Sequence, residues 1–134
     1  MYRVAAYITA YQDVDAVRKC ITAIKKQSYP VEKIYIIDNS TLPISNQIND
    51  HDKLIFEHHP ENIGIAEGLN ISIAWSIQEN YDFLWTFDQD SEPIPNTLSS
   101  LIETYNKLIN NNINLGIVAC LPIDQSTEYK LQGL

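Results

Sequence analysis

The chain has 134 residues, of which 45% are hydrophobic and 19% charged, as in an ordinary soluble globular domain. Its formal net charge of −8 argues against a nucleic-acid partner, because such a partner requires a basic surface. No apolar run reaches the roughly 20 residues of a membrane-spanning helix, so we expect any membrane association to be peripheral. Cys20 and Cys120 lack C-x-x-C spacing, and they predict a reduced, cytoplasmic compartment.

The first half of the chain alternates short apolar runs with amphipathic segments. An apolar run at 4–8 predicts a strand, and apolar residues three and four apart predict a helix over 14–27, with Asp13 or Asp15 in its first turn. A β-branched run at 33–38 predicts a second strand that ends at Asp38. A short helix at 44–50 and a third strand at 53–57 follow.

The second half continues this alternation. We expect a helix over 64–79, a strand that ends at Asp88, a helix over 98–109 and a last strand at 116–121. Helical spacing over 64–79 predicts that the buried residues are Leu69, Ile73 and Ile77, with Ala66 and Ala74.

Apolar strands separated by helices predict an α/β fold with a doubly wound, mostly parallel sheet and helices on both faces. Ligands of such sheets bind beyond the carboxyl ends of the strands, where the strand order reverses. Thr9 and Tyr11, Asp38, and the pair Asp88 and Asp90 all lie at such ends. We therefore expect these polar residues to converge on one site.

Two carboxylates two residues apart end the strand that contains Trp85. Alternation along an extended chain predicts that Asp88 and Asp90 face the same side, where they could share a divalent cation or a diphosphate. The alternative is an ordinary solvated turn. His58 and His59 are adjacent and precede a proline, a spacing that does not favour a metal site.

Several segments, taken in order, resemble the inverting family 2 glycosyltransferases, which have the A-type nucleotide-sugar-binding fold. The resemblance covers nearly the whole chain. Its motifs are Thr9-Ala10-Tyr11, Ile37-Asp38-Asn39-Ser40, Asn62-Ile63-Gly64-Ile65-Ala66 with Asn70, and Thr86-Phe87-Asp88-Gln89-Asp90-Ser91. Within the family, the third and fourth motifs look most like rhamnosyltransferase-type members of surface polysaccharide assembly.

The resemblance implies that Thr9 and Tyr11 frame the base and ribose of a nucleotide. It also implies that Asp38 accepts a hydrogen bond from the pyrimidine N–H, and a buried carboxylate suits such a donor. Two plainer alternatives remain. Asp38 would serve only as a turn-forming residue, and Tyr11 would be an exposed aromatic side chain of a loop.

The resemblance also implies which residues lie at the diphosphate end of the nucleotide. The resemblance implies that Asn62 and Gly64 shape a loop beside the diphosphate, with Gly64 approaching closely or adopting positive φ. An ordinary helix start is the alternative for these two residues. Asp88 would contact the ribose or the metal, and Asp90 would be a ligand of Mg²⁺ or Mn²⁺, which prefer oxygen ligands.

The activity implied is inverting, metal-assisted transfer of a sugar from a dTDP-rhamnose-like or UDP-sugar donor to a glycan or lipid-linked glycan, in the cytoplasm or at the inner face of the membrane. The family's general base lies in acceptor-side sequence that we do not find, and neither Asp124 nor Glu128 matches its motif. We therefore expect residues 1–134 to form a single donor-binding domain, truncated before the acceptor-binding part. Such a chain would have weak or no turnover, and it would form a homodimer to cover exposed apolar surface.

Two other enzyme classes and one non-catalytic function are alternatives to a glycosyltransferase. A sugar-nucleotide nucleotidyltransferase requires a glycine-rich, basic loop after the first strand, and the segment Thr9-Ala10-Tyr11-Gln12-Asp13 contains no Gly, Lys or Arg. A phosphatase with a D-x-D pair carries it on the first strand, not the fourth. A non-catalytic module that binds a nucleotide sugar or a protein remains the open alternative.

Overall fold

A four-stranded parallel sheet with helices on both faces forms the first 95 residues, as the sequence predicts. The computed structural model describes residues 1–121, and it divides into two compact units, one spanning Met1–Pro95 and one beginning at Asn96. The first unit contains β1 (Val4–Ala10), α1 (Val14–Lys25), β2 (Lys33–Asp38), the short 3₁₀ helix η1 (Ile44–Gln47), β3 (Leu54–His58), α2 (Gly64–Gln78) and β4 (Phe83–Asp88). The second unit contains α3 (Thr97–Asn110).

The strand order is β3-β2-β1-β4, and every neighbouring pair is parallel. The chain therefore builds the sheet outward from β1 to β3 and then returns to place β4 on the other side of β1. The order reverses between β1 and β4, and this reversal is the position at which doubly wound sheets bind their ligands.

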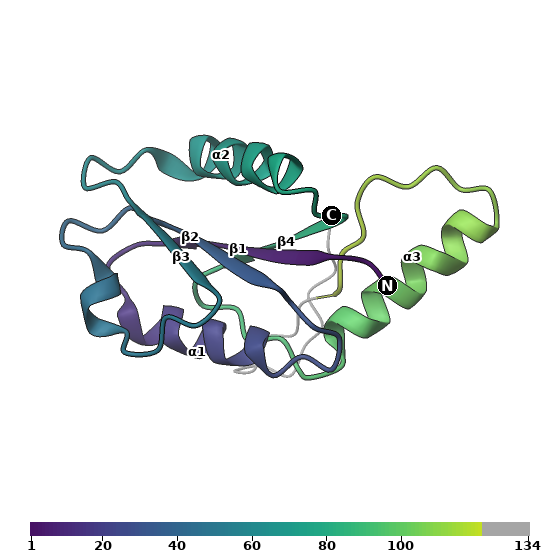
Figure 1. The fold of residues 1–134 in the computed structure, drawn as a ribbon, viewed down its shortest axis with the longest axis horizontal. Helices are drawn as coiled ribbons and strands as arrows, with labels where there is room; N and C mark the ends of the chain where they lie inside the picture. The colour runs from purple at the N-terminus through teal and green to yellow at the C-terminus, as the bar shows by residue number, and fades with distance from the viewer. Residues whose placement is uncertain (122–134) are drawn as a thin grey trace. The chain divides into compact units, whose positions relative to one another are not determined.

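Helix α1 covers one face of the sheet, and α2 covers the other (Figure 1). The side chain of Asp13 caps α1 by accepting a hydrogen bond from the backbone N–H of Ala16 at 3.1 Å. The buried side of α1 consists of Val17, Cys20, Ile21 and Ile24. Asp15 lies in the first turn of the helix, where a negative charge complements the helix dipole.

The predicted buried face of α2 is wrong. The buried residues of this helix are Gly68, Ser72 and Ser76, whereas 41% of Ile73 and 69% of Ile77 is exposed. Leu69 is half-buried, and Ala66 and Ala74 are exposed.

Large aromatic side chains on the sheet explain this choice of face. Tyr7 and Tyr35 are buried beneath α2 and pack with Ile37, so small helix residues fit against them. A methyl group added at Gly68 would lie 2.6 Å from the Tyr7 hydroxyl. Glycine at this position lets the helix approach the sheet closely.

The strand predicted at 116–121 is also wrong. These residues form no strand, and 85% of Ile117 and 58% of Leu121 is exposed. An apolar run becomes a strand only where a neighbour takes up its backbone hydrogen bonds. Asp124 and Glu128 lie outside the described residues.

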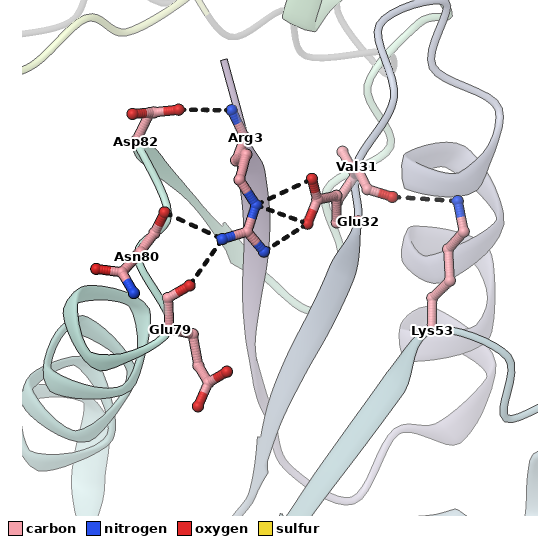
Figure 2. A network of polar contacts seen from close by, with 7 residues as sticks. All are labelled: Arg3, Val31, Glu32, Lys53, Glu79, Asn80 and Asp82. Carbon is pink, nitrogen blue, oxygen red and sulfur yellow. Dashed lines mark hydrogen bonds and ion pairs between the residues drawn. The ribbon is translucent and has the colours of Figure 1, made fainter. Parts of the chain in front are cut away.

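Arg3 fastens the amino ends of the strands, opposite the predicted site (Figure 2). Its guanidinium group pairs with Glu32 at 2.8 Å and donates to the backbone carbonyls of Glu79 at 2.8 Å and Asn80 at 3.2 Å. Its backbone N–H donates to the carboxylate of Asp82 at 2.7 Å. Arg3 thus joins β1 to the segment before β2 and to the connection between α2 and β4.

Candidate functional site

The carboxyl ends of β1, β2 and β4 lie at the same level of the sheet. Thr9 is the register partner of both Ile37 and Asp88, and Ala10 is the partner of Asp38. Three of the sequence-predicted segments therefore converge, as expected. Register partners share a face, so Thr9 and Asp88 lie on the α2 face, and Asp38 lies on the α1 face.

Asp38 is buried, with 1% of its surface exposed. One carboxylate oxygen accepts a hydrogen bond from the backbone N–H of Ser40 at 3.0 Å, and the other accepts from Ile44 N–H at 2.8 Å. The carboxylate therefore holds both ends of the loop that follows β2, residues 39–43, here called the β2 loop. The turn-forming role proposed as an alternative for Asp38 is observed.

The segment after β1, residues 11–13, here called the β1 loop, is attached on two sides. On the β4 side, the backbone N–H of Tyr11 donates to Gln89 Oε1 at 2.8 Å, and Gln89 Nε2 donates to the Tyr11 carbonyl at 3.2 Å. The Tyr11 ring remains half-exposed.

The other attachment of the β1 loop is to the β2 loop. The backbone N–H of Gln12 donates to Ser40 Oγ at 2.7 Å, and Gln12 Oε1 accepts from the Thr41 hydroxyl at 2.9 Å. Gln12 adopts a positive φ of 51°, which turns its backbone toward the β2 loop. Gln12 and Gln89 were not predicted as site residues, although each lies in a polar segment that follows a predicted strand.

The prediction that strand alternation places Asp88 and Asp90 on the same side rests on a wrong premise. β4 ends at Asp88, and residues 88–91 form a turn, here called the β4 turn, in which Ser91 N–H donates to the Asp88 carbonyl at 3.1 Å. Alternation applies only to extended backbone, so it does not govern Asp90. Both side chains are exposed at the end of the sheet.

These carboxylates fit a hard divalent cation. Mg²⁺ is typically held by one or two carboxylates together with substrate phosphates and water, and it prefers oxygen ligands. Among residues 1–121, no group of three or more His, Cys, Asp or Glu side chains is placed to hold a metal. A metal at Asp88 and Asp90 would therefore take its remaining ligands from a bound phosphate and from water.

The loop before α2 adopts the conformation that Gly64 was expected to provide. Asn62 has φ 57° and Gly64 has φ 82°, and the Asn62 side chain accepts a hydrogen bond from Gly64 N–H at 3.1 Å. Asn39 Oδ1 accepts from Ile63 N–H at 3.2 Å, which ties this loop to the β2 loop. Because α2 begins at Gly64, the helix-start alternative is observed as well.

A cavity of about 470 Å³ opens between the β1 and β2 loops. The cavity borders the β2 loop, whose two ends are bonded to Asp38. The residues that line the cavity were not predicted from the sequence. They are Gln12, Val14, Ser40, Thr41, Leu42, Ile44 and Gln47.

The two adjacent histidines bind protein groups. His58 Nε2 lies 2.8 Å from the Ser40 carbonyl oxygen. His59 lies between two carboxylates, with 3.2 Å from Nε2 to Glu57 and 3.2 Å from Nδ1 to Glu61. Burial lowers the pKa of His59, but its hydrogen bond to Glu61 and its charge contact with Glu57 outweigh that effect, so its pKa is raised above the usual value.

Comparison with known proteins links this geometry to one family. The profile described as Glycosyl transferase family 2 matches residues 6–122. Hyaluronan synthase of Streptococcus pyogenes is 28% identical, over 78% of this chain and 27% of the synthase, and the synthase of serotype M1 matches equally. The chain thus spans about a quarter of the length of these curated relatives.

A solved structure shares the fold. The crystal structure of S. aureus TarS superposes with a TM-score of 0.61 at 17% sequence identity, covering 78% of this chain and 20% of TarS. Within the described part of the chain, no helix combines the length and hydropathy needed to cross a bilayer.

Proposed function

The chain belongs to glycosyl transferase family 2, and from this premise we propose that it binds a nucleoside-diphosphate sugar at the carboxyl ends of β1, β2 and β4. The observation that carries the proposal is the common level of Thr9, Asp38 and Asp88, which lie beside the reversal of strand order. In this arrangement the sugar is transferred from its diphosphate to a glycan or lipid-linked glycan acceptor.

Thr9, Tyr11 and Asp38 form the base and ribose end of the proposed site. The Tyr11 ring is exposed enough to stack on a base, and its backbone is fixed from the β4 side. Asp38 already accepts one backbone N–H on each oxygen, and each oxygen retains a second lone pair. A pyrimidine imide reaches it only when the β2 loop moves aside, because Asp38 is buried.

Asp88 and Asp90 form the diphosphate end, together with the loop containing Asn62 and Gly64. Gly64 N–H is bonded to the Asn62 side chain, but the N-cap residue Ile63 supplies no side-chain acceptor for the next N–H groups of α2, which could therefore donate to an anionic oxygen. A bound Mg²⁺ or Mn²⁺ supplies charge neutralisation for the departing nucleoside diphosphate. The protein orients Asp88 through its place at the end of β4 and Asp90 through the β4 turn.

For the donor we propose a UDP- or dTDP-linked sugar, of the dTDP-rhamnose type in the second case, with inverting transfer in polysaccharide assembly. We assign no general base to this chain. We also propose a cytoplasmic location, which accords with the free cysteines Cys20 and Cys120, and peripheral contact with the inner face of the membrane. Donor binding without transfer to any glycan acceptor, measured on a longer version that includes acceptor-side sequence, would favour the non-catalytic module.

A homodimer is proposed from the apolar surface. Ile65 and Ile77 are 67% and 69% exposed on α2, and a second copy could cover them. Sedimentation velocity across a range of concentrations tests this proposal. A monomer at every concentration would contradict it.

An NMR titration tests the proposed donor site. UDP and dTDP are added separately to the ¹⁵N-labelled chain, with and without Mg²⁺. We expect shifts in the β1 loop, the β2 loop and the β4 turn, larger with metal, and their loss in Asp90→Ala. Asp52→Ala, an exposed carboxylate before β3, is the control. Absence of binding by either nucleotide would overturn the proposal.

A further inference from the structure

We propose that Gln89, the middle residue of the D-x-D segment, is a positioning residue that sets Asp88 and Asp90 relative to the β1 loop. The inference rests on the proposed function, because it concerns how that site couples its nucleotide end to its metal end. Its basis is the pairing of the Gln89 side-chain amide with the backbone of Tyr11. In the part of the chain that the structure describes, the Asp88 and Asp90 carboxylates make no such pairing.

The pairing has two points. Gln89 Oε1 accepts from Tyr11 N–H at 2.8 Å, and Gln89 Nε2 donates to the Tyr11 carbonyl at 3.2 Å. One bond would fix a distance, whereas two antiparallel bonds also fix the orientation of the β4 turn. A primary amide offers both a donor and an acceptor in this arrangement, whereas an ionised carboxylate offers acceptors alone.

The carboxylates on either side of Gln89 have no comparable anchor. Within residues 1–121, neither the Asp88 nor the Asp90 carboxylate takes part in a hydrogen bond or an ion pair, and both side chains are exposed. The turn is also held by the backbone bond from Ser91 to Asp88 and by the Cys20 thiol, which lies 4.0 Å from the Asp88 carbonyl oxygen. Gln89 is the side chain of this turn that attaches it to the β1 loop.

Tyr11, which Gln89 holds from the β4 side, belongs to a loop that is also attached to the β2 loop. Gln12, next to Tyr11, is bonded through its backbone to Ser40 and through its side chain to Thr41. The β1 loop thus forms a bridge between the β2 loop and the β4 turn. A ligand that contacts both Tyr11 and the β4 turn would meet groups whose separation is set before it binds.

Binding linkage tests the inference. The dissociation constant of UDP is measured by calorimetry with and without Mg²⁺ for the unmodified chain, Gln89→Ala, Gln89→Glu and the control Gln78→Ala. Gln78 ends α2 and is exposed. We expect the enhancement by metal to fall about tenfold in Gln89→Ala, with a smaller loss of metal-free affinity, because the β1 loop keeps its attachment to the β2 loop through Gln12.

Gln89→Glu distinguishes the effect of the two hydrogen bonds to Tyr11 from the effect of side-chain size. Glu can accept from Tyr11 N–H but cannot donate to its carbonyl, so we expect an intermediate enhancement by metal, while Gln78→Ala matches the unmodified chain. Equal enhancement in Gln89→Ala and the unmodified chain would overturn this inference alone. An equal loss of affinity with and without metal would also overturn it, because it would indicate only a structural role.

Two outcomes concern the unmodified chain. If it binds UDP with no enhancement by Mg²⁺, the metal role and the Gln89 inference fail, and nucleotide binding stands. If it binds no nucleotide under either condition, the proposed function fails, and the inference fails with it.

Discussion

Thr9 and Asp88 are register partners across β1 and β4, the two strands between which the sheet reverses its order. They share the α2 face of the sheet, whereas Asp38 lies on the α1 face at the same level. The proposed donor site therefore lies across the edge formed by the strand ends, with the metal carboxylate Asp88 and the base carboxylate Asp38 on different sides.

Replacement of Asp38 by Asn is expected to destabilise the protein by about 1–3 kcal/mol. An amide can accept from Ser40 or Ile44, but its NH₂ group must then face the other backbone donor. Chemical denaturation measures the change. Asp52→Asn, at an exposed position, is the matched control and is expected to have little effect.

An N3-methylated uridine diphosphate separates the two roles of Asp38. If Asp38 also accepts the base imide, methylation at N3 should weaken binding to the unmodified chain by about tenfold or more, because it removes the donor. Equal affinity for the two nucleotides would restrict Asp38 to holding the β2 loop.

Substitution of Gly68 by Ala is expected to destabilise the fold by about 1–2 kcal/mol, despite the better helix propensity of alanine. The added methyl group would lie 2.6 Å from the buried Tyr7 hydroxyl, which accepts a hydrogen bond from Thr9 at 2.8 Å. Asn70→Ala, on the exposed side of the same helix, should instead stabilise by about 0.5 kcal/mol. Equal gains from both substitutions would show that α2 is not closely packed on Tyr7.

The stability contributed by His59 should depend on pH. Its folded pKa is raised above 6.5, so the contribution is complete below about pH 6.5 and is lost as the pH rises through the folded value. Thermal melts of the unmodified chain and His59→Gln should differ more at about pH 6 than at about pH 8.5. A difference that grows toward high pH would contradict the ion contacts with Glu57 and Glu61.

The two cysteines should differ in reactivity. Burial raises the pKa of Cys20 to about 12, with a further contribution from Asp90, Glu92 and Asp88, and its thiol lies 4.0 Å from the Asp88 carbonyl. Cys120 is exposed. A thiol reagent at about pH 8 should modify Cys120 quickly and Cys20 only after denaturation. Rapid native modification of both thiols would contradict the burial of Cys20.

Much of this fold follows from the sequence. The apolar runs and helical spacings predict β1 to β4, α1 and α3, because each element buries a face that its own pattern marks. The face of α2 does not follow. Periodicity places Ile73 and Ile77 inside, but the space is taken by Tyr7 and Tyr35, which belong to strands distant in sequence.

The sequence predicts part of the site, namely the residues at the strand ends. Strand ends locate Thr9, Asp38 and Asp88, since parallel strands bring their carboxyl ends to one edge. The pairing of Gln89 with Tyr11 depends on the turn that β4 makes after Asp88, and turn geometry is not encoded in hydrophobic pattern. Residue spacing alone had suggested an extended D-x-D segment.

Paramagnetic broadening tests whether a metal binds at the end of β4. Mn²⁺ is added at substoichiometric amounts to the ¹⁵N-labelled chain saturated with UDP, and the same experiment is run on Asp90→Asn. We expect the strongest broadening at the amides of Asp88, Gln89 and Asp90, then at Tyr11, and its loss in the variant. Broadening centred on Glu57 and Glu61, or unchanged by the substitution, would contradict a metal-diphosphate site at the end of β4.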